Sequence, residues 1–237
     1  MNSSISTIPL MNLSLAFIPA IVVITIMFRW GLDFKSSLYA LGRMLLQLFL
    51  VGYCLSYIFE ARSSWIVVMV LAVMVSFSSW IALRTVKPKR RILLKKAFLA
   101  IITGGGITLF LVTRVVLRLD PWYLPRYMVP LAGMIFANSM NGISLAAERL
   151  EAELGQNKPY TKARNIAFGA SIIPIMNSLF AVGLVSIPGM MSGQILSGIS
   201  PFIAARYQIM VMCMIFGSVG MSSACFLKWA QAEFTSL

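Results

Sequence analysis

Two asparagines and a methionine within one long apolar run are the side chains best suited to contact a solute inside a membrane. Met134, Asn138 and Asn141 lie in the string PLAGMIFANSMNG at 130–142. Spacings of three and four residues place them on one face of a helix. Amides are costly in hydrocarbon unless they face the bundle or a cavity, and thioethers are soft, weak metal ligands. The pattern is typical of a transport pathway or of hydrogen bonding between helices.

A second segment, PGMMSGQILSGISP at 188–201, is too short to cross a bilayer twice and too apolar for an ordinary loop. Non-helical backbone at membrane depth is tolerated only where protein or a water-filled cavity satisfies its polar groups. We therefore expect a re-entrant or interfacial segment that forms part of a pathway, or alternatively a tightly packed external turn. The candidate pathway residues here are Pro188, Gly189, Met190, Met191 and Gly193.

The longest hydrophilic segment, ERLEAELGQNKPYTKAR at 148–164, predicts an amphipathic cytoplasmic helix. Leu150 and Leu154 share one face, and glycine is a common residue at a helix end. Such a helix between two spanning helices can act as a lever for a cytoplasmic partner, or it can be a solvated connector. The candidate partner-coupling residues are Glu148, Arg149, Glu151, Glu153 and Gly155.

The elements that position these residues are predicted to be membrane-spanning helices. The chain of 237 residues is 59% hydrophobic and 11% charged, which is too few charges to cover a soluble domain. A spanning helix needs about 20 apolar residues. We expect an all-α membrane protein with one polytopic domain, 1–237, and about seven transmembrane helices. The apolar runs are 8–28, 38–59, 65–83, 97–117, 127–147, 165–187 and 202–227. Because residues 1–7 carry no positive charge, the first run is expected to be retained and not to be a signal peptide.

The basic residues predict the orientation of the chain. Seven lie in RTVKPKRRILLKK at 84–96, and 14 of the 20 fall on one side if the N-terminus is outside. Lys and Arg accumulate in cytoplasmic loops, so the C-terminus is expected on the cytoplasmic side and the N-terminus on the outer side. The membrane is expected to be a plasma (bacterial inner) membrane. The basic segment is expected to lie against anionic lipid headgroups. A nucleic-acid patch is the alternative that we do not favour.

The sequence lacks the residues that several classes of function require. The sequence has no histidine, no phosphate-binding loop and no nucleophile with a neighbouring base, and its three cysteines lie in apolar runs. None of the seven acidic residues lies at the centre of a run, where a proton-coupled transporter usually places one. Gly104, Gly105 and Gly106 are expected to permit close helix packing. We expect neither an enzyme nor a self-contained pump, so the driving energy must come from a partner.

Four stretches resemble a known family. They are GRMLLQLFLVGYCLSYIF at 42–59, PLAGMIFANSMNGISLAAERL at 130–150, VGLVSIPGMMSGQILSG at 182–198 and ARYQIMV at 205–211. In these the chain resembles the permeases of Fet-type ABC exporters, bacterial iron exporters with plant relatives in aluminium tolerance.

The resemblance implies a permease that moves iron or another metal ion outward, with a second copy of itself and a separate ATP-binding subunit. The permease itself would bind no cofactor, because ATP and Mg²⁺ would be held by that subunit, and 148–164 would be the coupling helix. The chain departs from the family at LGQNKPYTKAR (154–164), at Ala137 and at Asn177, where relatives often carry Asp. Losing that carboxylate weakens the iron assignment. A small organic solute such as a nucleotide sugar, or an ATPase-independent channel, therefore remains an alternative.

Overall fold

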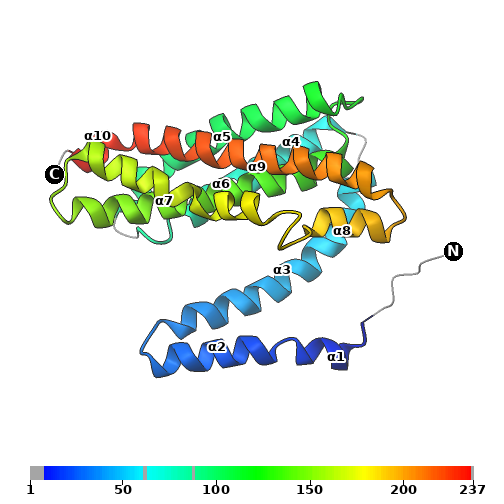
Figure 1. The fold of residues 1–237 in the computed structure, drawn as a ribbon, viewed down its shortest axis with the longest axis horizontal. Coiled ribbons are helices and arrows are strands. Elements are labelled where there is room, and N and C mark those ends of the chain that lie inside the picture. The colour runs from blue at the N-terminus through cyan, green and yellow to red at the C-terminus, as the bar shows by residue number, and fades with distance from the viewer. Residues whose placement is uncertain (1–7, 61–62, 87–88, 236–237) are drawn as a thin grey trace. The chain divides into compact units, whose positions relative to one another are not determined.

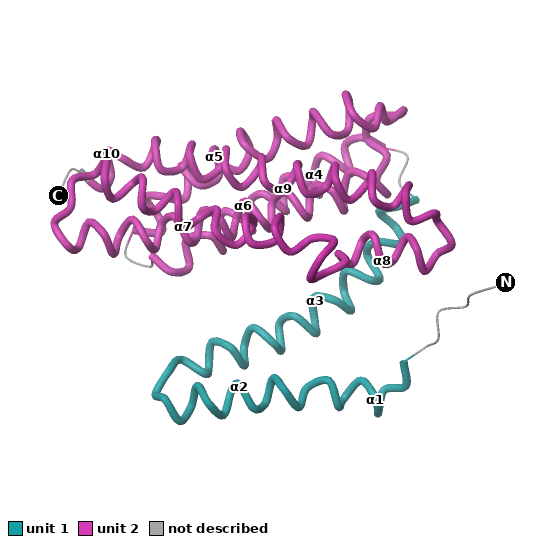
Figure 2. The backbone as a smooth tube through the Cα atoms, in the orientation of Figure 1, with its two compact units in different colours: residues 1–60 teal, residues 61–237 magenta. Residues whose placement is uncertain are grey.

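The computed structural model describes residues 8–60, 63–86 and 89–235, so the segment 1–7 and the cations Arg62 and Lys87 lie outside the described residues. Ten α-helices and one π-helical turn make up most of this part of the chain (Figure 1). The chain divides into two compact units, residues 1–60 and 61–237 (Figure 2). The prediction of an all-α membrane protein is confirmed.

The first unit contains α1 (Leu10–Leu15), α2 (Ile18–Arg29) and α3 (Phe34–Glu60). The turn between α2 and α3 uses Gly31 at φ +68°, and the Asp33 carboxylate accepts a hydrogen bond from Ser36 N at 3.1 Å at the start of α3. None of the described residues of these helices is buried. Their apolar side chains therefore need lipid or another protein surface to cover them.

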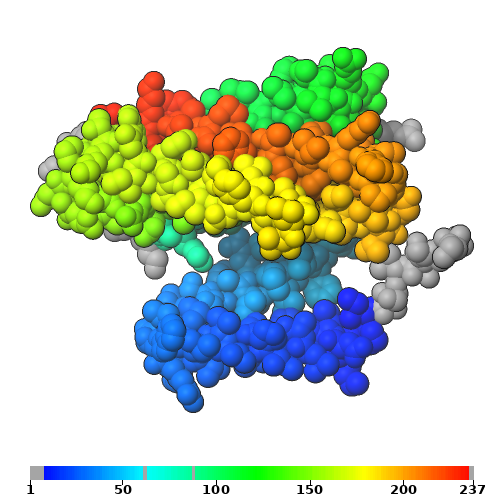
Figure 3. Space-filling model, in the orientation of Figure 1, coloured from blue at the N-terminus to red at the C-terminus, as the bar shows by residue number. Residues whose placement is uncertain are grey.

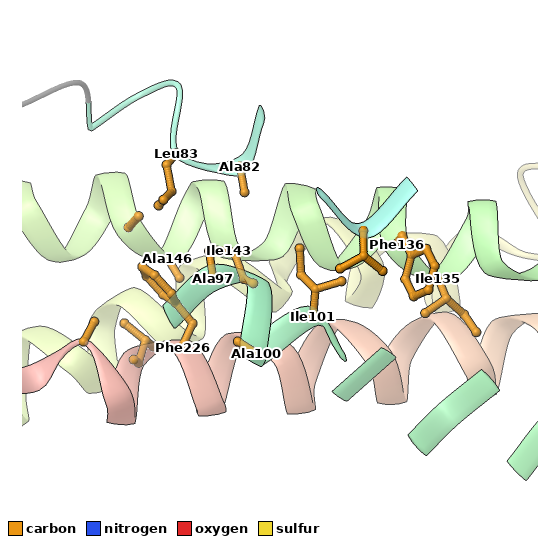
Figure 4. Packing of buried hydrophobic residues seen from close by; sticks show 14 of the residues in the cluster. Ala82, Leu83, Ala97, Ala100, Ile101, Ile135, Phe136, Ile143, Ala146 and Phe226 are labelled. Atoms are coloured by element: carbon orange, nitrogen blue, oxygen red, sulfur yellow. The ribbon is translucent and has the colours of Figure 1, made fainter. Parts of the chain in front are cut away.

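The second unit is a bundle of long helices. They are α4 (Ser64–Ala82), α5 (Arg90–Phe110) with the π-helical turn η2 (Leu111–Val116), α6 (Pro125–Leu154), α7 (Tyr160–Ala181), α8 (Gly189–Leu196), α9 (Pro201–Trp229) and α10 (Gln231–Thr235). The core lies where α4, α5, α6 and α9 meet. Figure 4 shows Ala97 and Ile101 of α5 packed close to Ile143 of α6 and Phe226 of α9.

Small residues allow α5, α6 and α9 to approach closely. A Cβ atom added to Gly104 would lie 2.5 Å from Ser222 N, and one added to Gly142 would lie 2.8 Å from Ser223 Oγ. The hydroxyl of Ser139 donates to the carbonyl of Ser218 at 3.3 Å. The expected close packing is therefore confirmed at Gly104 and, against Ile135, at Gly105, whereas a Cβ on Gly106 would meet open space.

The number of spanning helices agrees with the predicted number of about seven, while the bounds of one predicted run differ. Six helical stretches of the described chain are long and apolar enough to cross a membrane, and α7 is not among them. With 22 residues α7 has the necessary length, but Lys162, Arg164 and Asn165 make its first turns polar. It also ends at Ala181, six residues before the predicted run does.

The basic segments gather at one end of the second unit. Arg90, at the start of α5, donates to the Trp80 carbonyl near the end of α4 at 2.7 Å through Nη2. Lys96 lies 3.9 Å from Glu233 of α10, and the hydroxyl of Tyr160 donates to Leu227 O at the end of α9. The segments 89–96 and 148–164 and the end of α9 therefore share one end of the bundle (Figure 1).

Candidate functional site

A cavity of about 520 Å³ lies between α6, α7, the segment around α8, and α9. Helices α7, α8 and α9, yellow-green to red, form the face of the second unit that is seen in Figure 3. The cavity combines amides, hydroxyls and thioethers with aliphatic side chains. Its lining is Met134, Asn138, Ile175, Asn177, Ser178, Ala181, Val182, Ser186, Pro188, Met190, Gln208, Val211, Met212 and Ile215. The two segments that the sequence singled out, 130–142 and 188–201, therefore meet at one site.

The geometry of helix α6 places two of its residues at the cavity. Met134 and Asn138 are one turn apart, and the side-chain nitrogen of Asn138 donates to the Met134 carbonyl at 2.8 Å. That bond occupies one amide donor and leaves the side-chain oxygen as an acceptor for a ligand or water. Asn138 is half-buried, in agreement with a polar side chain that faces a cavity and not lipid.

A neighbouring cavity of about 240 Å³ shares Met134 and Met190 with the first. It is also bordered by Gln194 of α8 and by Tyr207 and Met210 of α9. The two cavities share these methionines, so the thioethers lie between them. A solute that moved from one cavity to the other would contact these thioethers. Thioethers are flexible and polarisable, so they can line such a passage without holding the solute tightly.

Two glutamines are the polar groups that the sequence analysis missed. Gln208 is only 5% exposed, and its Oε1 atom has no hydrogen-bond partner among the described residues. The buried Oε1 of Gln194 also lacks one. An unpaired buried acceptor costs about 1–3 kcal/mol unless a ligand or water supplies a donor. Gln208 lies in an apolar run just as Asn138 does, so the same polar-in-apolar signal could have identified it.

Four of the eight predicted pathway residues line the larger cavity, and four do not. Met134, Asn138, Pro188 and Met190 line the larger cavity. Asn141 is exposed on α6 and lies outside its lining, although the helical repeat places it near Asn138. The remaining three lie in or at the start of α8. Met191 lines a separate, mostly apolar cavity of about 440 Å³, and Gly189 and Gly193 are exposed.

The segment 188–201, predicted to be re-entrant or interfacial or else an external turn, contains the short helix α8. Gly189 and Gly193 have helical φ values, and only Gly198 takes the left-handed conformation, at φ +86°. Pro188 precedes the helix as its N-cap residue. Met190 can therefore line the cavity because a helical turn presents its side chain there.

The polar segment 148–164 is not a separate surface helix. Its first seven residues are the last turns of α6, and α7 begins at Tyr160. Gly155 follows the end of α6, as predicted, but in a right-handed conformation at φ −61°. The left-handed residue of the turn is Asn157, at φ +57°. One helix therefore runs without a break from the cavity into the polar segment.

We call residues 148–164 the polar turn: they comprise the end of α6, the connection 155–159 and the start of α7. Glu153 is its central charged residue. Only 1% of its side chain is exposed; Oε1 lies 2.6 Å from Arg149 Nη2, and Oε2 pairs with Lys158 Nζ. A buried carboxylate requires such partners. Glu153 thus fixes the turn and presents no charge to a partner protein, whereas the other predicted coupling residues reach the surface. Glu148, Arg149 and Gly155 are exposed, and Glu151 is half-buried.

The donors of the cavity permit weak contact with a metal ion. No residue in its described lining carries a carboxylate or an imidazole. In residues 8–60, 63–86 and 89–235, no three His, Cys, Asp or Glu side chains come close enough together to hold a metal ion. Thioether and amide groups remain, and these suit transient contact with a passing solute.

Comparisons with known proteins match nearly the whole chain. The profile of the uncharacterised protein family UPF0014 matches residues 10–235. The chain is 36% identical to the UPF0014 membrane protein slr1647 of Synechocystis, over 79% of each chain. It is 32% identical to the probable iron export permease protein FetB of Escherichia coli, over 93% of this chain and 90% of that protein. It is 29% identical to the protein ALUMINUM SENSITIVE 3 of Arabidopsis thaliana, over 90% and 84%. No solved structure matches.

Proposed function

Since the chain belongs to the UPF0014 family, we propose that it is the permease subunit of an ABC-type exporter. It would carry its solute out of the cytoplasm, driven by ATP that a separate ATP-binding subunit hydrolyses. Two copies of the chain would work with two such subunits. Similarity to a probable iron export permease supports the transport role, and the sequence contains no phosphate-binding loop that could use ATP itself.

One observation carries the proposal: a single helix joins the cavity to the polar turn. Helix α6 contains Met134 and Asn138 at the cavity and Glu153 at the turn. At 1.5 Å per residue, Met134 and Glu153 are separated by about 28 Å along the helix axis. Helix α7 returns from the turn to the cavity, where it supplies Asn177 and Ser178. A push on the turn can therefore reach the cavity through α6, which is continuous from Met134 to Glu153, and through α7, which contains Pro174 just before its cavity residues.

The polar turn has the features of a docking site for the ATP-binding subunit. The pairs that Glu153 makes with Arg149 and Lys158 hold the turn in one shape. The hydroxyl of Tyr160 donates to Leu227 O and ties the turn to α9. A stiff turn transmits force, and the exposed Glu148 offers a charge to a partner. ATP and Mg²⁺ would bind only to that partner.

Iron or another metal ion is the cargo that the relatives favour. The named iron export permease covers nearly the same length as this chain. Three methionines, Met134, Met190 and Met212, offer thioethers to the cavity. Their weak binding suits a site that must release its cargo.

The unpaired glutamine oxygens favour a small organic solute as a second candidate. Gln208 and Gln194 each present a buried acceptor without a partner, and hydroxyl groups of a solute such as a nucleotide sugar can supply the missing donors. Asn177 gives the cavity another neutral polar group. This candidate uses the same cavity and the same coupling turn. An ATPase-independent channel is a further alternative.

The location follows from the position of the basic segments. The segments 89–96 and 148–164 lie at one end of the second unit, together with the end of α9, whereas Arg114, Arg118, Arg126 and Arg206 lie on the connections and helix ends away from it. By the positive-inside rule, this distribution supports our proposal that the polar turn and the C-terminus are cytoplasmic and the N-terminus is outside, in the plasma membrane of a bacterium.

Co-purification tests the docking role of the turn. The ATP-binding subunit, co-expressed with the chain, should remain bound through purification in mild detergent. Glu148→Lys reverses an exposed charge on the turn and should release it. The matched control is Glu60→Lys, which reverses an exposed glutamate at the end of α3. Equal retention of the subunit by both variants would contradict the assignment of the turn.

A further inference from the structure

Most cations at the start of α5 already have partners within the chain. Five lie between residues 89 and 96, and three of them make specific contacts with α4 or α10. Lys89 Nζ lies 4.1 Å from the centre of the Phe234 ring, the Arg90 guanidinium lies 3.5 Å from the Trp80 ring, and Lys96 Nζ lies 3.9 Å from Glu233. These three therefore stabilise the packing at this end of the bundle.

The other two cations, Arg91 and Lys95, have a different environment. They are exposed, stand one helical turn apart, and have no described carboxylate within 4.0 Å. Both border a cavity of about 350 Å³ between α4 and α5. Two positive charges at the edge of a cavity without a counter-charge make a site for an anion.

The walls of this cavity are apolar below the charges. Leu94 and Phe98 of α5 line it together with Ser76 and Ser79 of α4. Phe98 lies two turns after Arg91, about 10 Å further along the helix axis. We call this cavity the groove. Its lining is therefore cationic near the start of α5 and apolar further along the helix.

The serines of α4 do not add hydrogen-bond donors to the groove. Ser76 Oγ donates to Ala72 O at 2.8 Å, and Ser79 Oγ donates to Val75 O at 2.7 Å. Only Arg91 and Lys95 are left to recognise an anion. A guanidinium can bind two phosphate oxygens at once, while an ammonium adds a point charge.

We propose that the groove between α4 and α5 binds one anionic phospholipid. Its phosphate pairs with Arg91 and Lys95, and its acyl chain lies over Leu94 and Phe98. The groove is at the end of the bundle where the basic segments gather, which is the level of the headgroups of a surrounding bilayer. A free phosphate would use the charges and leave the apolar wall in contact with water, so the lipid satisfies both halves of the site. This proposal does not depend on the transported solute.

Native mass spectrometry of the full chain tests the proposal. The chain is reconstituted in phosphatidylcholine nanodiscs with phosphatidylglycerol as the minor component, and the lipid retained after release into detergent is counted. The groove variant is Arg91→Gln with Lys95→Gln. Its control is Lys35→Gln with Arg84→Gln, which removes the same charge from two exposed positions outside the groove. Thermal unfolding of each variant in detergent confirms that it is folded.

The proposal predicts one retained phosphatidylglycerol per wild-type chain and a roughly thirtyfold loss in the groove variant, with no loss in the control. An excess of inorganic phosphate should not displace the lipid. Equal retention by the groove variant and the control would overturn the proposal, because the charges would then act only as a diffuse surface. Displacement by inorganic phosphate would also overturn it, because a free anion would then be the ligand. If the groove variant does not fold, Leu94→Ala with Phe98→Ala, which keeps the cations, adds no charge and shortens the apolar wall, should cause the same loss.

Discussion

Glu153 and Lys158 pair across the turn that joins α6 to α7, with the carboxylate buried and the ammonium partly exposed. Arg149, one turn before Glu153, binds the other carboxylate oxygen. The turn is therefore closed by three charged side chains. The polar segment is held in one shape before any partner binds, and this rigidity is what the proposed coupling requires.

Replacing Glu153 should loosen the turn. Glu153→Gln removes the buried charge that both Arg149 and Lys158 contact, so the melting temperature in detergent should fall by several degrees. Glu148→Gln, at an exposed position on the same helix, should leave the melting temperature nearly unchanged. Equal melting temperatures for the two variants would show that the charged cluster adds no stability.

The contact between α5 and α9 should not tolerate a methyl group. In Gly104→Ala the new Cβ would lie 2.5 Å from the backbone nitrogen of Ser222, so the helices must separate. We expect a loss of about 1–3 kcal/mol in the free energy of unfolding. Gly106→Ala is the matched control, because nothing lies within 4 Å of its added Cβ and alanine favours a helix. Denaturant titration in detergent micelles measures both, and a stable Gly104→Ala protein would argue against the packing described.

The sequence predicts the long helices well and the connections between them poorly. Apolar runs mark spanning helices because a single segment in lipid can satisfy its own backbone hydrogen bonds only as a helix, and α3, α4 and α9 lie close to their predicted bounds. The polar segment was predicted as a separate helix because its charges end the apolar run. In the structure α6 continues through it, since backbone hydrogen bonds do not require apolar side chains.

Site residues were predictable where a polar side chain interrupts an apolar run. Asn138 gives that signal and lines the cavity, but Gln208 gives the same signal and was missed. The helical repeat grouped Asn141 with Asn138, but a shared helix face is broad, and only neighbouring helices decide which part of it borders a cavity. The pairing of Glu153 with Lys158 depends on the turn, so the spacing of charges alone could not show it.

Gln208 should matter for transport and not for folding. In Gln208→Leu an unpaired buried acceptor is replaced by an apolar group, so the melting temperature should stay the same or rise. Transport by the complete complex should fall about tenfold if the amide binds the solute, since that corresponds to about 1.4 kcal/mol. Ile209→Leu, next to it on α9 but 64% exposed, serves as the control. Unchanged transport in Gln208→Leu would remove this amide from the pathway.

Labelling of engineered cysteines tests the orientation. Lys162→Cys, on the polar turn, should react with a membrane-impermeant maleimide in inverted vesicles and not in intact cells, after the three native cysteines are replaced by serine. Asp120→Cys, in the connection between η2 and α6, should show the opposite pattern. The reason is the excess of basic residues at the end that carries the turn. Reaction of Lys162→Cys in intact cells would reverse the assigned topology.

Transport in proteoliposomes tests the coupling through α6 and the polar turn most directly. Vesicles that contain the chain and its ATP-binding subunit should move iron, another metal ion or a nucleotide sugar against its gradient only when ATP is supplied on the side of the polar turn. Vesicles that contain the chain alone should not do so. The cargo that stimulates ATP hydrolysis in the same complex decides between a metal ion and an organic solute. Accumulation of any of these solutes against its gradient by the chain alone, without nucleotide, would contradict the account.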